Sequence, residues 1–328
     1  MSTIKDKIKT TLLNAQKEYQ KVFYGSCAVL LYHRVTQLET DPQQLSVTPA
    51  NFDVHIEHLK KNYRLLTVQE FQYHLENKKR FPKKSVLITF DDGYADNYLE
   101  ALPILEKHNA QGLFYIATGT LNTDKEYWWD ALERIVLLSL NMHSSEKFII
   151  KDVIYDLTDL SKGKRLELYE RLLPVLRAIN SSVREEKINE LAQIFNSFQG
   201  RATHRAMTFQ ELKNMSVSES AVIGAHTHLH PSLGALTYEE QLKEIETSKN
   251  ILEQLVSKKI THFSYPFGTV NDFNADTLDI VKKMDFKLVA ANIPYLVHKK
   301  TDKYAFTRFL VRDWNVVALE KQIQSFFR

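Results

Sequence analysis

Cysteine is almost absent from this chain of 328 residues, in which Cys27 is the single example. One cysteine can form no internal disulfide bond and cannot build a cysteine-rich metal site. Any metal ion that the protein binds must therefore be held by histidine and carboxylate side chains, of which the sequence has many.

Long apolar runs and a strong excess of charge are also lacking. No stretch is long enough to span a bilayer, and the first twenty residues have no continuous apolar core of the kind found in secretion signals. We therefore expect a cytoplasmic location. The net charge of +3 is small, and no basic stripe is interleaved with aromatic residues. This composition predicts no nucleic-acid partner.

The amino-terminal segment has a helical pattern of its own. Apolar residues recur at helical spacing over residues 1–22, with lysines between them. Such a pattern predicts an amphipathic basic helix within residues 1–26, which packs on the protein body or rests peripherally on an anionic membrane surface. The apolar positions are Ile4, Ile8, Leu12, Ala15, Tyr19 and Val22.

The most informative stretch is residues 85–94, where an apolar run leads into Asp91, Asp92 and Gly93. This pattern is typical of a buried parallel strand with polar groups at its carboxyl end, where α/β folds bind ligands. Two neighbouring carboxylates repel each other, and a metal ion is the simplest way to keep both ionised. The alternative is an ordinary turn, since Asp and Gly are common turn residues.

Strands and helices alternate over residues 27–120 and again over residues 207–328, which predicts a parallel sheet or barrel. Between these two parts, residues 121–206 are predicted to be helical, with a small hairpin around 148–155. We interpret this segment as an insertion that serves either as a lid or substrate-recognition wall, or as a purely stabilising addition.

Two histidines follow the strand predicted at 221–224. His226 and His230 are four residues apart, so on one helical turn they would face the same way, whereas His228 would point elsewhere. Two imidazoles and one carboxylate form a common open zinc site, and Asp91 or Asp92 is available as the carboxylate.

The segments Thr89–Tyr94 and His226–Pro231 resemble the first two motifs of the polysaccharide deacetylases, the NodB-homology domain of carbohydrate esterase family 4. The resemblance implies an α/β fold, a distorted (β/α)7-type barrel, with a bound divalent metal, usually Zn²⁺. It implies hydrolysis of an N-acetyl group on a sugar, less often an O-acetyl group, by a water molecule that the metal activates. It also implies that Asp91 is the catalytic base and that Asp92, His226 and His230 are the metal ligands.

A third motif, Phe263–Gly268, is similar but looser. The resemblance implies that the backbone N–H of Phe267 stabilises the oxyanion. Many members carry an arginine here that orients the base, where this chain has Ser264, so Arg308 on the last strand is our candidate for that guanidinium. The general acid has two candidates. His33 resembles the Tyr-His of a branch acting on bacterial exopolysaccharides and is preferred, whereas His298 matches a late Leu-x-His pattern.

The sequence thus predicts a metal-dependent deacetylase acting on an N-acetylated saccharide in a cell-surface polysaccharide or its precursor, with deformylation as a related reaction. One alternative is a glycoside hydrolase, although adjacent carboxylates fit poorly because such enzymes place their carboxylates across a cleft. The other alternative is a carbohydrate-binding module without activity on a degenerate barrel.

Overall fold

The structure is a computed structural model that describes residues 25–139 and 147–327. The amphipathic helix predicted within residues 1–26 therefore lies almost entirely outside the described residues. Within the described ranges, every helix is too short or too polar to cross a lipid bilayer.

Six parallel strands form the main sheet, in the order β11-β10-β9-β6-β5-β1. Each strand is short and buried, and its apolar run in the sequence corresponds to a strand covered on both faces. The strands are β1 (Ser26–Tyr32), β5 (Ser85–Phe90), β6 (Gly112–Ile116), β9 (Ala221–Ala225), β10 (His262–Ser264) and β11 (Leu288–Ala290).

The sheet closes into a barrel through the segment that ends in β13 (Phe309–Leu310). Phe306 forms a parallel bridge with Ala290 of β11, and three residues later Phe309 pairs with Leu30 of β1. The two edges of the sheet are thereby joined. The structure confirms the predicted α/β fold of the (β/α)7 barrel type with a helical insertion.

Short strands complete the sheets. β4 (Arg64–Leu65) pairs with the beginning of β5, and β12 (Val297–His298) runs antiparallel to the beginning of β1. A separate parallel pair is formed by β2 (Arg34–Val35) and β3 (Ser46–Val47).

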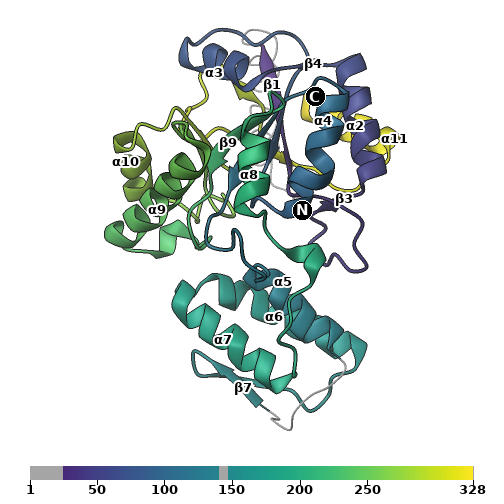
Figure 1. The fold of residues 1–328 in the computed structure, drawn as a ribbon, viewed down its shortest axis with the longest axis vertical. Helices are drawn as coiled ribbons and strands as arrows, with labels where there is room; N and C mark the ends of the chain where they lie inside the picture. Colours follow the sequence, from purple (N-terminus) through teal and green to yellow (C-terminus); the bar gives the residue numbers. More distant parts are fainter. Residues whose placement is uncertain (1–24, 140–146, 328) are drawn as a thin grey trace, which may run out of the picture.

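Helices surround the barrel (Figure 1). Threonine begins several of them, and Thr67, Thr208 and Thr237 each form a capping box with a glutamate three residues later. The helices are α2 (Pro49–Asn62), α3 (Val68–Glu76), α4 (Leu102–Lys107) with a π-helical turn η1 (Asn97–Ala101) before it, α8 (Phe209–Ser216), α9 (Tyr238–Val256), α10 (Ala275–Lys283) and α11 (Val316–Phe327), with short 3-10 turns η3 (Ala202–His204) and η4 (Leu233–Ala235).

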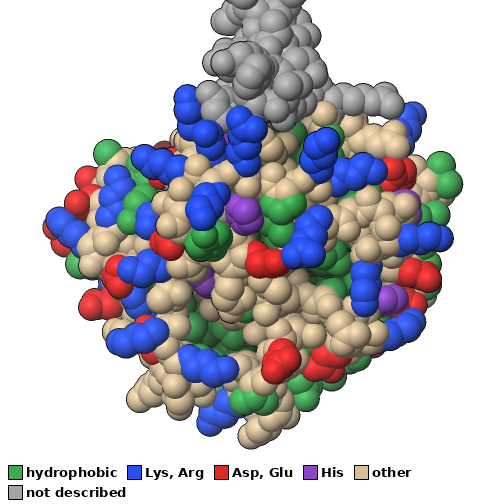
Figure 2. Space-filling model, turned by 90° about the horizontal axis from the view of Figure 1, so that it is seen from above, with side chains coloured by type: hydrophobic (Ala, Val, Ile, Leu, Met, Phe, Trp, Pro, Cys, Tyr) green, Lys and Arg blue, Asp and Glu red, His purple; other side chains and the backbone are tan. Residues whose placement is uncertain are grey.

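The segment predicted as an insertion lies at one end of the barrel (Figure 1). It contains α5 (Trp128–Glu133), η2 (Arg134–Leu138), the antiparallel hairpin of β7 (Lys147–Ile150) and β8 (Val153–Asp156), α6 (Lys162–Arg177) and α7 (Ser181–Ile194). These elements share an apolar cluster separate from the barrel core. The exact limits at 120/121 and 206/207 stay predictions. Figure 2 shows the opposite end of the molecule, where basic and acidic side chains are interspersed.

An aromatic stack lies in the core layer between the sheet and helix α2. The rings of Phe90 on β5 and Phe114 on β6 lie parallel at 4.4 Å between centroids, and Tyr32 and Phe52 pack against Phe90. All four side chains are fully buried. Asp91 directly follows Phe90, so the same stack that stabilises the barrel fixes the end of the strand that carries the carboxylates.

Replacing Phe114 with alanine should lower the free energy of unfolding by about 3–5 kcal/mol, because the truncation leaves a cavity in a closely packed core. Urea denaturation followed by circular dichroism measures this loss. Val317→Ala is the control, since Val317 is 75% exposed, and it should change stability by no more than about 0.5 kcal/mol. Equal effects of the two substitutions would contradict the assigned core.

Candidate active site

The polar groups predicted to act together lie at the carboxyl ends of neighbouring parallel strands. His33 follows β1, Asp91 and Asp92 follow β5, His226 follows β9, and Ser264 is the last residue of β10. Because parallel strands present their carboxyl ends at one edge, these side chains meet at one end of the barrel. Both carboxylates and His226 are at least 95% buried.

Asp92, His226 and His230 form a compact group. Oδ1 of Asp92 lies 3.4 Å from Nε2 of His230 and 3.6 Å from Nε2 of His226. One ligand atom from each residue lies within 4.8 Å of the others. The Nδ1 atom of His226 hydrogen-bonds to the carbonyl oxygen of Ser264 at 2.8 Å, which directs the lone pair of Nε2 toward Asp92.

The electrostatics of this group suit a divalent cation. Burial lowers the pKa of His226, and burial together with the charge of Arg184 lowers the pKa of His230 to about 3. Both imidazoles are thus neutral, which is the form that binds metal. Burial raises the pKa of Asp92, and within residues 25–139 and 147–327 neither lysine nor arginine forms an ion pair with it. A bound cation would compensate this carboxylate.

The expectation that His226 and His230 share a helical turn is wrong. They lie on an irregular loop in which Thr227 and His230 have positive φ angles of 64° and 53°. The backbone N–H of His230 donates to Oγ1 of Thr227 at 3.2 Å, and Glu244 accepts the N–H groups of His228 and Leu229. A polar loop, held by side-chain acceptors, therefore brings the two imidazoles together where a helix was expected.

Asp91 is paired with Arg308, the arginine proposed to replace the one missing from the third motif. Nη1 and Nη2 of Arg308 donate to the two carboxylate oxygens at 2.7 and 2.8 Å, and Nη2 also donates to Oγ of Ser264 at 2.8 Å. Burial alone would raise the pKa of Asp91, but the positive charge and the hydrogen bonds of Arg308 lower it below its ordinary value. Asp91 is therefore held ionised and oriented.

The two candidates for the general acid lie at opposite ends of β1. His33 follows the carboxyl end of β1, close enough for the charges of Asp92 and Asp91 to act on its pKa, which burial lowers overall. Its Nδ1 atom is buried and has no hydrogen-bond partner in the described part of the chain. His298 pairs with Ser26 at the amino end of the same strand, about 20 Å away at the usual rise per residue.

Phe267, from the third motif, also lies at the site. Its ring is 4.7 Å from the ring of His230, centroid to centroid. Its backbone has a positive φ of 59°, and Gly268 follows with a φ of 65°. The third-motif loop therefore makes a tight, irregular turn beside the candidate metal ligand, as expected of a segment that presents a backbone N–H to a ligand.

Two aromatic residues outside the motifs, Tyr127 and Trp129, contact residues of the candidate site. The hydroxyl of Tyr127 donates to the carbonyl oxygen of Asp92 at 2.6 Å, and the ring of Trp129 packs 4.7 Å from that of His230. Trp129 in turn donates to the hydroxyl of Tyr94, which donates to Asp130. The Tyr-Trp-Trp run at 127–129 is conspicuous in the sequence, but its contacts depend on the fold.

A second group of possible ligands, Asp130, Glu133 and His204, is also buried. Arginines already supply positive charge here: Arg201 donates to Glu133, and the charges of Arg34 and Arg201 lower the pKa of His204, which burial already depresses, to about 3. The need for a cation is therefore weaker than at Asp92.

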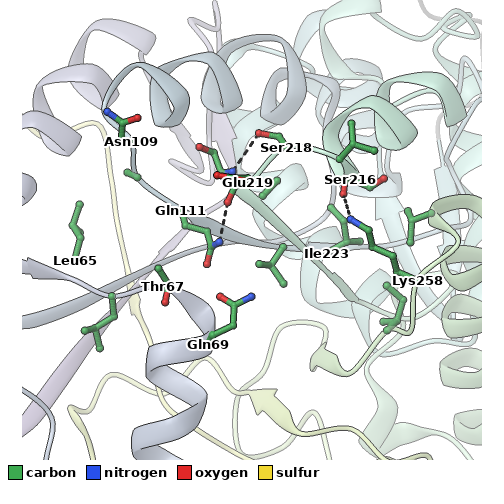
Figure 3. Close-up of a pocket in the computed structure, with 18 of the residues that line it drawn as sticks. Leu65, Thr67, Gln69, Asn109, Gln111, Ser216, Ser218, Glu219, Ile223 and Lys258 are labelled. Atoms are coloured by element: carbon green, nitrogen blue, oxygen red, sulfur yellow. Dashed lines mark hydrogen bonds between the residues drawn. The ribbon is translucent and has the colours of Figure 1, made fainter.

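A pocket of about 670 Å³ lies at the other end of the strands (Figure 3). Its wall includes Gln111 and Ala221, at the amino ends of β6 and β9, and the side chain of Gln111 donates to the carbonyl oxygen of Glu219. None of the predicted site residues lines it. We therefore place the active site at the carboxyl ends, where the ionisable groups converge.

Comparison with known proteins identifies the fold and the family together. The family model described as polysaccharide deacetylase matches residues 78–146 and 166–289. The chain belongs to the polysaccharide deacetylase family. The predicted family and the predicted enzyme class, a hydrolase acting on carbon–nitrogen bonds other than peptide bonds, are confirmed.

Relatives of this polysaccharide deacetylase are known from bacteria. The poly-beta-1,6-N-acetyl-D-glucosamine N-deacetylase of Staphylococcus aureus (strain N315) is 23% identical over 302 residues, covering 88% of this chain and 80% of that protein. The structure of IcaB from Ammonifex degensii covers 93% of this chain and 98% of its own, at 18% identity and a TM-score of 0.59. The Streptococcus pyogenes deacetylase PplD, in complex with acetate, covers 92% and 99%, at 20% identity and a TM-score of 0.55.

Substituting Arg308 with methionine should lower the free energy of unfolding at pH 7 by about 3–5 kcal/mol, because it leaves a buried carboxylate unpaired. The loss should shrink as the pH falls toward 4. Without Arg308, burial raises the pKa of Asp91 above its unfolded value, so protonation stabilises the folded variant as the pH falls. In the wild type the pKa of Asp91 lies below its unfolded value, so the ion pair's contribution is largely kept down to pH 4.

Urea denaturation in the presence of a chelator, at pH 7 and pH 4, measures this difference without metal. Arg64→Met is the matched control, since Arg64 pairs with Glu70 at the surface and the substitution should cost no more than about 1 kcal/mol. A loss for Arg308→Met that is independent of pH would contradict the electrostatic coupling to Asp91.

Proposed function

We propose that this protein is a metal-dependent deacetylase that hydrolyses the N-acetyl amide of a sugar in a cell-surface polysaccharide or its precursor. The observation that carries the proposal is the buried set of Asp92, His226 and His230 directly beside the ionised Asp91. The relationship to the poly-beta-1,6-N-acetyl-D-glucosamine N-deacetylases of Staphylococcus aureus favours a poly-N-acetylglucosamine-like substrate.

Asp92, His226 and His230 would hold the divalent metal, with Zn²⁺ suited to two imidazoles and one carboxylate. A cation bound there would lower the pKa of a water molecule and polarise the amide carbonyl of the substrate. Neutral imidazoles and an unpaired buried carboxylate support this assignment.

Asp91 would accept the proton of the attacking water as the general base. The guanidinium of Arg308 holds both carboxylate oxygens, so the carboxylate stays ionised and keeps a fixed orientation. The backbone N–H of Phe267 would donate to the oxyanion that forms at the amide carbon. His33, beside the two aspartates, would give a proton to the departing amine or position the sugar.

The cytoplasmic location and peripheral membrane contact through residues 1–22 remain part of the proposal. The alternative of a binding module without activity is disfavoured because the base, its arginine partner and all three candidate ligands are present.

Replacing Asp91 with asparagine should lower acetate release from an N-acetylglucosamine oligomer by about 10²–10⁴-fold, because the general base is lost. Metal content, measured by plasma mass spectrometry, should stay at the wild-type level. Asp92→Ala should instead lose both metal and activity, and a chelator should abolish wild-type acetate release reversibly. Full activity after complete metal removal would refute the metal mechanism, and an inactive wild type with bound metal would favour the binding-module alternative.

His33→Gln should reduce kcat by about 100-fold if this imidazole transfers a proton to the leaving amine. His298→Gln is the matched control and should leave kcat near the wild-type value, because His298 lies at the amino end of β1. Steady-state kinetics of acetate release across pH 5–9 would test both variants. Normal turnover with an unchanged pH profile in His33→Gln would remove His33 from the mechanism.

A further inference from the structure

The insertion contacts the active-site loops through arginines at the junction of its two long helices. Arg177 is the last residue of α6, and Arg184 lies in the first turn of α7. The charges of both arginines act on the pKa of His230, so both lie near this candidate ligand. The two arginines reach different loops of the barrel, as the hydrogen bonds described below indicate.

Arg177 reaches the third-motif loop, residues 266–272. Its Nη2 atom donates to both carboxylate oxygens of Asp272, each at 2.5 Å. Its guanidinium carbon lies 4.0 Å from the centroid of the Phe267 ring. The side chain of Asp272 is only 3% exposed, whereas that of Arg177 is 35% exposed. The arginine therefore covers an otherwise buried carboxylate and stacks on an aromatic ring of the same loop.

Asp272 holds this loop together. It accepts hydrogen bonds from the backbone N–H and the hydroxyl of Thr269, and from the hydroxyl of Ser232. Its own carbonyl oxygen accepts the N–H of Gly234. The loop that begins at Phe267 thus depends on one carboxylate, and Arg177 is its only ion-pair partner among the described residues.

Phe267 links this loop to the reaction centre. Its ring contacts both Arg177 and His230: the ring centroid lies 4.0 Å from the guanidinium carbon and 4.7 Å from the centroid of the imidazole. A shift of the ring would move the backbone of Phe267, whose φ is positive and therefore held by its surroundings. The proposed oxyanion donor lies on that backbone.

Arg184 makes a similar contact with the second-motif loop, residues 226–231. Its Nη2 donates to the carbonyl oxygen of Leu229, the residue before His230, at 3.1 Å. Its guanidinium lies over the ring of Trp128 at 4.9 Å. The second-motif loop and the third-motif loop therefore each receive one arginine from the insertion.

We propose that Arg177 is a positioning residue, through which the insertion holds Phe267 and the third-motif loop in the geometry that deacetylation requires. The expected effect of Arg177 on turnover rests on the proposed function, whereas its expected effect on the loop does not. Truncating Arg177 leaves Asp272 buried without its cation, so the loop should relax toward conformations that hydrate the carboxylate. A displacement of about 1 Å at a reacting centre can cost about 100-fold in rate.

Three variants test this role: Arg177→Ala, Arg177→Lys and Arg171→Ala. Lysine keeps the charge for Asp272 but loses the planar contact with Phe267. Arg171 is the matched control, because it lies on the same helix and its guanidinium contacts Tyr155 inside the insertion. Steady-state kinetics of acetate release would be combined with amide hydrogen exchange of residues 267–272 and with metal content.

Arg177→Ala should lower kcat by about 10–100-fold with little change in KM, and the amides of residues 267–272 should exchange measurably faster. Arg177→Lys should restore part of both properties, and Arg171→Ala should match the wild type. Normal kcat and exchange in Arg177→Ala would overturn the proposal. A change in KM alone would also overturn it, because Arg177 would then be a substrate-binding residue. An equal loss of kcat in Arg171→Ala would overturn it as well.

Hydrogen exchange separates this proposal from the proposed function. If the wild type releases no acetate, the proposed function fails, but faster exchange of the loop in Arg177→Ala still supports the positioning role, and unchanged exchange overturns it. If Arg177→Ala does not fold, the comparison of Arg177→Lys with Arg171→Ala decides by the same readouts.

Discussion

The structure depends on how two adjacent carboxylates, both removed from water, are kept charged at the end of one strand. Asp91 and Asp92 follow β5 directly and point into the same buried end of the barrel. Two such charges in a medium of low polarity need separate compensation. Arg308 compensates Asp91 with hydrogen bonds to both oxygens. Burial raises the pKa of Asp92, and no lysine or arginine of the described residues forms an ion pair with it, so a bound cation would supply its compensation. The roles proposed for the two aspartates follow from this difference.

The barrel topology makes this division possible. Arg308 and Asp91 are 217 residues apart in the chain, yet the closure of the sheet between β11 and β1 brings the segment before β13 against the end of β5. Ser264 at the end of β10 contacts both partners: its hydroxyl lies next to Arg308 and Asp91, and its carbonyl oxygen fixes His226. One residue therefore links the orientation of the proposed base to that of a proposed metal ligand.

Much of this could be predicted from the sequence because the barrel strands are apolar on both faces and three of them, β1, β5 and β9, are followed directly by histidine or aspartate. The apolar run that leads into Asp91 forms β5, and the polar residues after β1, β5 and β9 meet as parallel strands require. The prediction of a helical turn at His226–His230 failed because a four-residue spacing is compatible with a loop stabilised by Thr227 and Glu244. His298 fits the Leu-x-His sequence pattern, but that pattern does not show that β12 runs antiparallel to β1 at its amino end. Sequence spacing does not specify which end of a strand a distant residue reaches.

The contacts between the insertion and the barrel loops could not be predicted from the sequence, for a further physical reason. Arg177 and Arg184 resemble any other basic residue on a charged helix, and nothing in the local pattern separates them from Arg171. They differ from Arg171 in position, because they lie at the junction of α6 and α7, beside the barrel. There Arg177 donates to the buried carboxylate of Asp272, and Arg184 donates to the carbonyl oxygen of Leu229. Hydrogen bonds from a charged guanidinium are stronger than those from neutral donors. The insertion, which has its own apolar cluster, thus contacts the loops of the candidate site through a few charged side chains.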